Sequence, residues 1–170
     1  MKKIIIITAI LIGILCINKS KVLIPEESIR FRVISSSNTN EDIRIKKKIV
    51  KSLKNKIYSI ESNNIEETRN NINNEIKNIE EIINSILVKN NYQKGYSINY
   101  GNNYFPKKTY KGIEYEAGEY ESLVITLGEG NGNNFWCVLF PPLCKIDNNI
   151  EDVEYKSFIV EIINKLIKKS

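Results

Sequence analysis

The sequence predicts an α+β domain in which a largely antiparallel sheet packs with a helical hairpin and a C-terminal helix. Three observations lead to this fold class. A short alternating stretch comes first, at residues 28–35. Two longer segments, 41–60 and 64–86, then carry apolar residues at helical spacing. Alternation returns between 92 and 140, before a last helical stripe at the C-terminal end.

The first predicted strand is amphipathic. Ile29, Phe31 and Val33 alternate with Arg30 and Arg32. Because successive side chains of a strand point to opposite faces, the apolar residues share one face and the arginines share the other. The pattern is typical of a half-buried strand.

Two amphipathic helices are predicted next. Residues 35–40 supply N-cap candidates, and Asp42 suits the first turn of a helix that extends to Ile60. Asn64 and Glu67 form a capping-box pattern at the start of the second helix. Isoleucines of that helix recur in steps of 7, 4, 3, 4 and 3 residues, at Ile65, Ile72, Ile76, Ile79, Ile83 and Ile86. This register favours packing on the first helix over a coiled-coil dimer.

Lysines cluster on the first helix, away from its apolar stripe or flanking it. They are Lys46, Lys47, Lys48, Lys51 and Lys54. A basic helical face can bind a membrane surface. Because lysine is frequent along the whole chain, a solvated helix face is the better interpretation.

Strand patterns fill the region after the hairpin. Residues 92–105 alternate loosely, and 110–127 alternate again with a break near Ala117. The glycine-rich residues 128–134 read as a flexible connection to the very apolar strand 135–140, which predicts a hairpin with a long loop. A last helix is expected after Asn149. Its apolar stripe is Tyr155, Phe158, Ile159, Ile162, Ile163, Leu166 and Ile167.

The N-terminus has the pattern of an export signal. Lys2 and Lys3 precede an apolar run at 4–17. As a helix this run would span ~21 Å, which is short of a ~30 Å hydrocarbon core. We expect residues 1–20 to be a signal peptide or an uncleaved anchor. Residues 21–170 are enough for a single domain with its own core.

Charge and residue types narrow the function classes. The chain has 25 basic and 20 acidic residues, and without Lys2, Lys3 and Lys19 the balance is 22 against 20. These charges are interspersed, whereas nucleic-acid binding needs a concentrated basic footprint. The sequence contains no histidine, which removes Ser-His-Asp and Cys-His nucleophile pairs and histidine-based zinc sites. We expect no nucleic-acid partner, no metal and no cofactor.

Two cysteines remain outside the signal segment, Cys137 and Cys144. An even pair in an exported protein is a disulfide candidate. Closing so short a loop would stabilise the fold by about 2–3 kcal/mol on the chain-entropy model. A nucleophilic cysteine would need a base, and a metal site would need further ligands, so a staple or plain buried thiols are favoured.

One carboxylate pair requires a catalytic interpretation. Glu119 and Glu121 share one face of a strand, and two carboxylates are the minimum for glycoside hydrolysis. Interleaved tyrosines make an ordinary polar face the simpler interpretation. An exported cell-wall or glycan hydrolase that uses these two residues is kept as the alternative function. Residues 128–132 lack the Gly-Lys-Ser/Thr ending of a phosphate loop and lead into a strand.

Five short motifs resemble the stage II sporulation protein R family. They lie at Gly118–Leu123, Gly128–Asn134, Trp136–Cys144, Arg30–Ile34 and Phe105–Lys107. Together they extend over most of the chain beyond the signal, and the Trp-Cys to Pro-Pro-Leu-Cys run is highly specific. The sequence departs from the family pattern at Glu116, Ser122 and Phe135, where the family usually has Pro, Ala and Trp.

The resemblance implies a developmental signal of endospore-forming bacteria. Such a protein is exported from the forespore into the space between forespore and mother cell. There it activates a membrane-embedded aspartic protease, which processes the sigma-E precursor in the mother cell. The chain would then be a ligand and not an enzyme. The residues that we expect to contact the protease are Glu119, Tyr120, Glu121, Trp136, Phe140, Pro141 and Pro142.

The role of Trp136 stays open at this level. Alternation would place Phe135, Cys137 and Leu139 on one face of the strand, opposite Trp136 and its neighbours Val138 and Phe140. The first interpretation is an aromatic anchor for the partner. The second is a core residue whose truncation to alanine would cost ~3–5 kcal/mol by leaving a cavity. The sequence does not say which face is buried.

Overall fold

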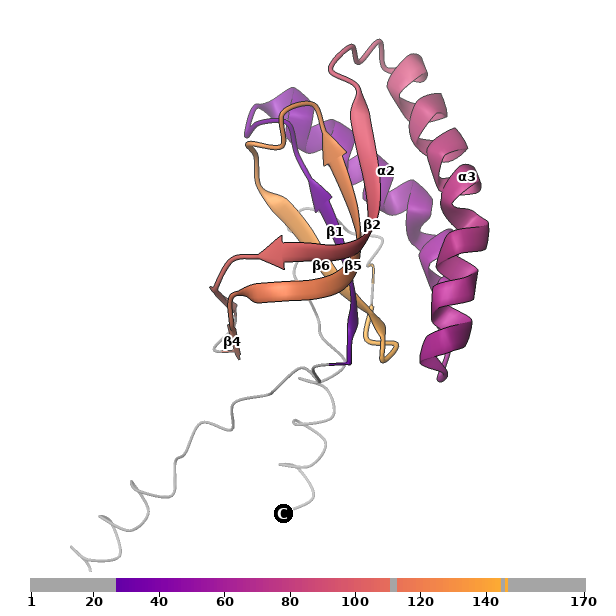
Figure 1. The fold of residues 1–170 in the computed structure, drawn as a ribbon. Coiled ribbons are helices and arrows are strands. Elements are labelled where there is room, and N and C mark those ends of the chain that lie inside the picture. The colour runs from indigo at the N-terminus through magenta and orange to yellow at the C-terminus, as the bar shows by residue number, and fades with distance from the viewer. Residues whose placement is uncertain (1–26, 111–112, 145, 147–170) are drawn as a thin grey trace, which may run out of the picture.

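A computed structural model of the chain describes residues 27–110, 113–144 and 146 (Figure 1). The predicted N-terminal signal or anchor and the predicted last helix lie outside the described residues. The elements are β1 (Ile29–Ile34), α2 (Asn40–Ile60), α3 (Ile65–Lys89), β2 (Tyr96–Phe105), β3 (Lys108–Tyr110), β4 (Ile113–Tyr115), β5 (Gly118–Leu127) and β6 (Asn134–Phe140).

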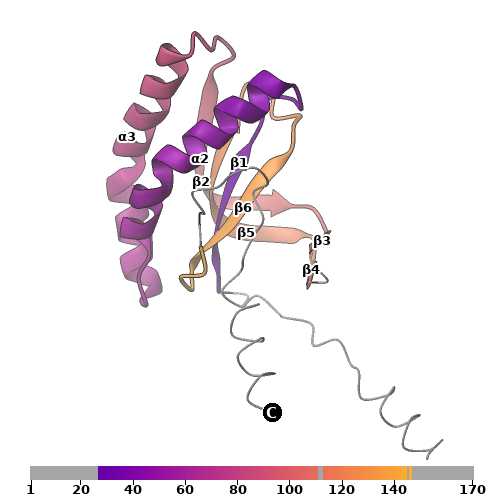
Figure 2. The ribbon, with the colours of Figure 1, turned by 180° about the vertical axis from the view of Figure 1, so that it is seen from behind.

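The described part is an α+β fold, as predicted. A four-stranded sheet has the order β2-β5-β1-β6, and β3 and β4 pair separately as a two-stranded sheet. Two of the three pairings in the larger sheet are antiparallel, and β1 runs parallel to β5. Helices α2 and α3 lie side by side on one face of this sheet, as both views show (Figures 1 and 2).

The predicted hairpin between β5 and β6 is wrong. β1 lies between these two strands and pairs with both. Crossing one intervening strand requires about 10 Å, and a connection of several residues can span about 20 Å. The loop is therefore long enough to step over β1. Pairing β1 on both edges satisfies its backbone groups in the middle of the sheet.

The connection between β5 and β6 is held to the loop after β1. Gly132 donates its N–H to the Ser35 carbonyl at 2.8 Å, and Asn131 donates to the Ser36 carbonyl at 3.0 Å. A Cβ on Gly132 would lie 2.3 Å from the carbonyl oxygen of Ser37. Glycine is required here because the two backbones approach so closely. The flexible connection expected from the sequence is instead an anchored loop.

Both helices begin at the predicted caps. The Thr39 side chain accepts a hydrogen bond from the Asp42 N–H, and the Asn64 side chain accepts one from the Glu67 N–H. In a capping box, Glu67 would accept directly from the Asn64 N–H. Here Ser62 lies between them: its hydroxyl accepts from the Asn64 N–H and donates to the Glu67 carboxylate. The helical hairpin predicted from the isoleucine register is confirmed.

The core lies between the helices and the sheet. The alternate residues Ile29, Phe31 and Val33 of β1 are fully buried against it, and Cys137 and Leu139 of β6 belong to the same cluster. These contacts show which face of β6 is buried. The Phe135 side of β6 is the core side, and Trp136 points the other way.

Simple alternation fails at the end of β6. The register between β1 and β6 shifts between Ile29 and Arg30, so that Ile29 pairs with Phe140 and Arg30 with Val138. This bulge inserts Leu139 as an extra residue. Phe140 therefore packs against the core cluster instead of following Trp136 to the opposite face.

Candidate partner-binding site

The face of the sheet opposite α2 and α3, here called the outer face, carries an arrangement of two arginines and three aromatic residues. Arg32 of β1 is paired with Trp136 of β6. Phe105 at the end of β2 is paired with Gly118, two residues before Tyr120. Since side chains alternate along each strand, all of these groups project from the same face.

These side chains form a continuous stack. The Arg30 guanidinium carbon lies 3.3 Å from the ring centre of Tyr120 and 5.3 Å from that of Phe105. The Arg32 carbon lies 5.5 Å from the Phe105 ring centre and 4.7 Å from that of Trp136. We call this set, Tyr120, Arg30, Phe105, Arg32 and Trp136, the arginine–aromatic ladder. Each cation–π contact is worth about 0.5–1 kcal/mol, and more where water is excluded.

Direct ring contacts support the ladder. Phe105 meets Trp136 edge to face at 4.9 Å between ring centres and meets Tyr120 at 6.0 Å. Gly118 makes room for the Tyr120 ring, because a Cβ there would lie 3.3 Å from three of its atoms. The Tyr120 hydroxyl donates to the Glu116 carbonyl at 3.2 Å. The rings are thus fixed by the sheet and by each other.

Arg32 has only neutral hydrogen-bond partners among the described residues. One terminal nitrogen donates to the Tyr104 carbonyl at 3.4 Å. The other donates to the side-chain oxygen of Asn134 at 2.9 Å, in the amide orientation that satisfies both groups of Asn134. Burial lowers the pKa of Arg32, although arginine stays charged at any physiological pH.

The disulfide candidate begins on β6, the strand that carries Trp136, but its two cysteines lie on the core side of the sheet. Cys137 and Cys144 are both buried, and their Cα atoms are 5.3 Å apart, within disulfide-bonding distance. Pro141 and Pro142 lie in the turn between them, and the Phe140–Pro141 peptide bond is cis. The two prolines are at the rim of the sheet and not in the ladder.

Glu61 joins the end of α2 to this turn. Its carboxylate accepts a hydrogen bond from the backbone N–H of Cys144, and burial raises its pKa to about 7. Nearby, the Tyr58 hydroxyl accepts from the Ile146 N–H at 2.8 Å. Cys144 and Ile146 are therefore held to the end of α2.

The predicted carboxylate pair is separated from the ladder. Glu121 lies on the helix side of β5, where Arg69 of α3 donates from two nitrogens at 3.0 and 2.7 Å and the Tyr100 hydroxyl donates at 2.7 Å. Arg69 lowers the pKa of Glu121, whereas a glycosidase acid needs a raised pKa. Glu119 is exposed on the same side. Glu121 thus ties the sheet to α3.

A second polar cluster, centred on Asp42, was not anticipated as such. The Asp42 side chain is fully buried and accepts from Lys94 at 2.8 Å, from the Tyr92 hydroxyl at 2.7 Å and from Ser37. Burial alone would raise the pKa of Asp42, but these hydrogen bonds hold it below its ordinary value. The sequence marked Asp42 only as a first-turn residue. The cluster fastens the start of α2 to the start of β2.

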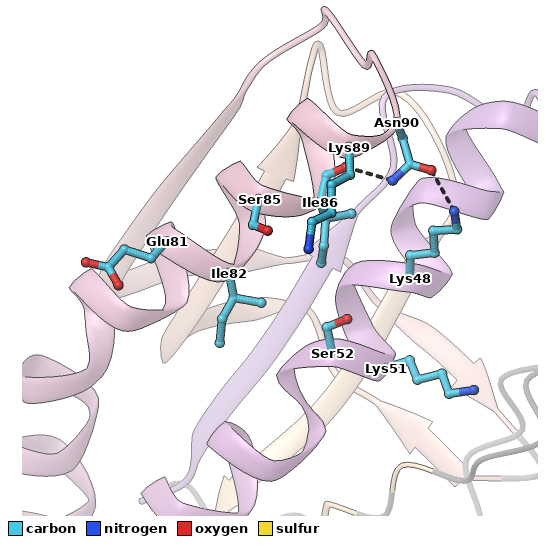
Figure 3. Close-up of a pocket in the computed structure, with 9 residues that line it drawn as sticks. All are labelled: Lys48, Lys51, Ser52, Glu81, Ile82, Ser85, Ile86, Lys89 and Asn90. Atoms are coloured by element: carbon cyan, nitrogen blue, oxygen red, sulfur yellow. Dashed lines mark hydrogen bonds between the residues drawn. The ribbon is translucent and has the colours of Figure 1, made fainter.

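A polar groove lies between α2 and α3 at the end where α3 terminates (Figure 3). Asn90 accepts from Lys48 at 2.6 Å and from Arg44 at 2.9 Å, and donates to the Ile86 carbonyl. Its other lining residues are Lys51, Ser52, Glu81, Ile82, Ser85 and Lys89. These hydrogen bonds join the two helices, and Lys48 and Lys51 are exposed as a solvated face would be.

The described residues contain no group of three or more His, Cys, Asp or Glu side chains that could hold a metal ion. No helix among them is long and apolar enough to cross a membrane.

Of the residues expected to contact a partner, the structure brings Tyr120 and Trp136 together. It adds Arg30, Arg32 and Phe105, which were seen in the sequence only as a strand face and as part of a short motif. The motif positions were the available signal, because the Arg30–Ile34 and Phe105–Lys107 motifs both contribute to the ladder.

Comparison with known proteins agrees with this distribution of motifs. The family model for stage II sporulation protein R matches residues 25–150. A stage II sporulation protein R from Bacillus subtilis (strain 168) is 37% identical over 128 residues, which cover 74% of this chain and 57% of that protein. The match therefore spans little more than half of that relative. No solved structure matches the chain. This chain belongs to the stage II sporulation protein R family, and a role in sporulation follows from that membership.

Proposed function

We propose that this protein is an exported sporulation signal that activates a membrane-embedded aspartic protease and so leads to processing of the sigma-E precursor in the mother cell. It acts in the space between forespore and mother cell. Residues 1–20 direct export or keep the domain at a membrane. Family membership supports the developmental role. The proposal concerns binding and not turnover.

The arginine–aromatic ladder is the observation that carries this proposal. Rigid aromatic and arginine side chains supply most of the binding energy at protein interfaces. Within the ladder, Arg30 and Phe105 are buried, at 6% and 1% exposure, and support the partly exposed side chains of Trp136, Tyr120 and Arg32. Because these three side chains are held by the sheet and by their neighbours, little conformational entropy is lost when a partner binds them. An activator must bind the active state of its target more tightly than the inactive state, and a preorganised surface suits such discrimination.

The hydrolase alternative is less well supported. Its proposed acid, Glu121, is bonded to Arg69 and Tyr100 on the helix side of the sheet. A carboxylate with these partners stays ionised, and its hydrogen bonds stabilise the fold.

Co-expression of this protein with the protease and its sigma-E precursor tests the proposal. Trp136→Ala and Tyr120→Ala should each reduce precursor cleavage by about tenfold or more, as hot-spot truncations do. Tyr104→Ala is the matched control, because Tyr104 is an exposed aromatic residue of the same sheet. It should leave cleavage unchanged.

Stability must be measured on the same variants. If Trp136→Ala and Tyr120→Ala remain folded and exported but precursor cleavage is normal, the ladder is not the activating surface. If cleavage occurs equally without this protein, the activating role itself is wrong.

A further inference from the structure

We infer that the edge of β2 that no described strand covers binds an extended segment of the partner protein, which adds to the sheet as a further strand. This inference rests on the proposed function, since it names the form in which the partner is recognised. It is built on the outward backbone groups of β2, on the composition of this strand and on its continuity with the ladder.

β2 lies at one margin of the larger sheet (Figure 1) and, within the described part of the chain, pairs only with β5. Gly128 donates to the Gly95 carbonyl at 3.0 Å, which continues the register of Tyr96 with Leu127. Hydrogen-bonded pairs alternate with non-bonded pairs along an antiparallel ladder. The N–H and C=O groups of the even-numbered residues of β2 therefore point away from β5.

Two observations agree with an open edge. The carbonyl of Tyr104, an even-numbered residue, accepts from Arg32 at 3.4 Å, as a group that points away from β5 can. A Cβ at Gly101 would have no described atom within 4 Å apart from its chain neighbours, so space is open at the middle of the strand. No described loop or helix forms a backbone hydrogen bond to Ile98 or Asn102. Their backbone groups are available to an added strand.

The sequence of β2 lacks the features that normally protect an edge strand. Such strands are kept short, carry Lys or Pro, or are bent by a bulge. β2 has 10 residues, none of them charged and none a proline, and its register with β5 is continuous. At ~3.3 Å per residue it offers an edge of ~33 Å, about twice the usual strand length. An unprotected edge of this length suits strand addition by another protein.

The side chains of β2 define the chemistry of the segment that fits. Tyr96, Ile98 and Tyr100 form a partly exposed apolar row on the helix side, packed against the core. Ser97 and Asn99 are exposed on the outer side. Because side chains of neighbouring strands meet on the same face, the added segment carries apolar residues at alternate positions and small polar residues between them. Neither row of β2 carries a charge, so charge does not select this segment.

The edge leads into the ladder. Phe105, the last residue of β2, meets Trp136 at 4.9 Å and Tyr120 at 6.0 Å between ring centres. A segment that adds along β2 therefore reaches the partly exposed rings of Trp136 and Tyr120. One partner can cover both surfaces, and this continuity favours the partner protein over a second copy of the chain.

Amide hydrogen exchange of the purified full-length chain reports on each position separately. In the free chain, the amides of Ile98, Tyr100 and Asn102 should exchange rapidly, whereas those of Ser97 and Asn99, which are bonded to β5, should exchange slowly. The probe is the capped peptide Thr-Ile-Asn-Val-Thr-Ile-Asn, which has the required alternation. At a peptide concentration of about ten times its Kd, the three rapid amides should slow by about tenfold. The same peptide with every amide N-methylated cannot form a ladder and should not slow them.

A proline variant tests the backbone contact. Asn102→Pro removes one outward N–H and places a ring at the edge, so peptide binding should weaken by about fivefold or more, the factor for one lost hydrogen bond. Asn102→Ala is the matched control, because it removes the same exposed side chain but keeps the N–H, and it should bind as the unmodified chain does. Urea unfolding shows whether both variants are folded. If Asn102→Pro is not, the N-methylated peptide makes the same comparison on the unmodified chain.

Four results would overturn the inference. The rapid amides could already be slow in the free chain, or they could slow as protein concentration alone rises, which would make a second copy the occupant. The peptide could fail to slow them or act no better than its N-methylated form, or folded Asn102→Pro could bind it unchanged. The protease has no part in this measurement. Its failure therefore refutes strand addition without refuting activation, and peptide binding without precursor cleavage does the reverse.

Discussion

Replacing Glu121 by glutamine should lower the free energy of unfolding by about 1–2 kcal/mol and leave signalling intact in the folded fraction. The carboxylate accepts from Arg69 at 3.0 and 2.7 Å and from the Tyr100 hydroxyl at 2.7 Å. A glutamine has nearly the same shape and retains one acceptor oxygen. The substitution thus removes mainly the charge that faces Arg69.

Partial exposure sets the magnitude. The side chains of Arg69 and Glu121 are 36% and 24% exposed. A fully exposed pair would contribute no more than about 1 kcal/mol, and a hydrogen bond to a charged group in a dry site contributes about 1.5–3 kcal/mol. An intermediate value follows for this pair, which connects elements 52 residues apart in the chain.

Urea unfolding followed by Trp136 emission measures this loss. A double-mutant cycle with Arg69→Gln should give a coupling energy of about 1 kcal/mol. Glu119→Gln is the matched control on the same strand, and it should stay within about 0.5 kcal/mol of the unmodified chain. A Glu121→Gln protein of unchanged stability that no longer supports precursor cleavage would refute a structural role and restore Glu121 as a contact or catalytic residue.

Three further predictions concern stability. Cys137→Ser with Cys144→Ser should cost about 2.5 kcal/mol by the loop-entropy relation, and a reductant should destabilise the unmodified chain equally; a reductant without effect would show that the disulfide is absent. Because burial raises the pKa of Glu61 from 4.5 to about 7, the free energy of unfolding should fall as pH rises through that interval. Glu61→Gln should abolish this fall. An unchanged pH profile in the variant would show that Glu61 is not the group responsible. Asp42→Ala should lower the free energy of unfolding by about 3 kcal/mol at neutral pH. Since the pKa of Asp42 is held below 3.8, the stabilisation that Asp42 provides should be lost as pH falls below that value. Equal acid sensitivity of the variant and the unmodified chain would refute this role of Asp42.

The helices and the first strand could be predicted closely because their signals are local. Isoleucine spacing located α3, and the caps at Thr39 and Asn64 depend on residues a few positions away. Alternation of Ile29, Phe31 and Val33 with two arginines correctly located β1 and its core face, but the other face is not open to solvent, because Arg30 is buried and Arg32 is only partly exposed. Such patterns depend only on which side of a single helix or strand is buried in the core.

The order of the sheet could not be predicted in this way. Alternation shows that a strand has two faces, but it does not say which strands are its neighbours. Residues 128–134 can close a hairpin or step over β1 with similar ease, and only the pairing of β1 on both edges decides between them.

The candidate site could be predicted only in part from the sequence, for the same reason. Trp136 and Tyr120 were expected from their motifs, but the bulge opposite Ile29 returned Phe140 to the core. Arg69, which holds Glu121, is 52 residues away in the chain.

By itself, the sequence determined the fold class, the helical hairpin, the amphipathic first strand and the family. Tertiary structure alone decided that arginines of β1, a phenylalanine of β2, a tyrosine of β5 and a tryptophan of β6 meet on one face. The reason is physical. Periodicity records how each segment meets water and core, whereas a stack of side chains from four strands depends on long-range register that no local pattern encodes.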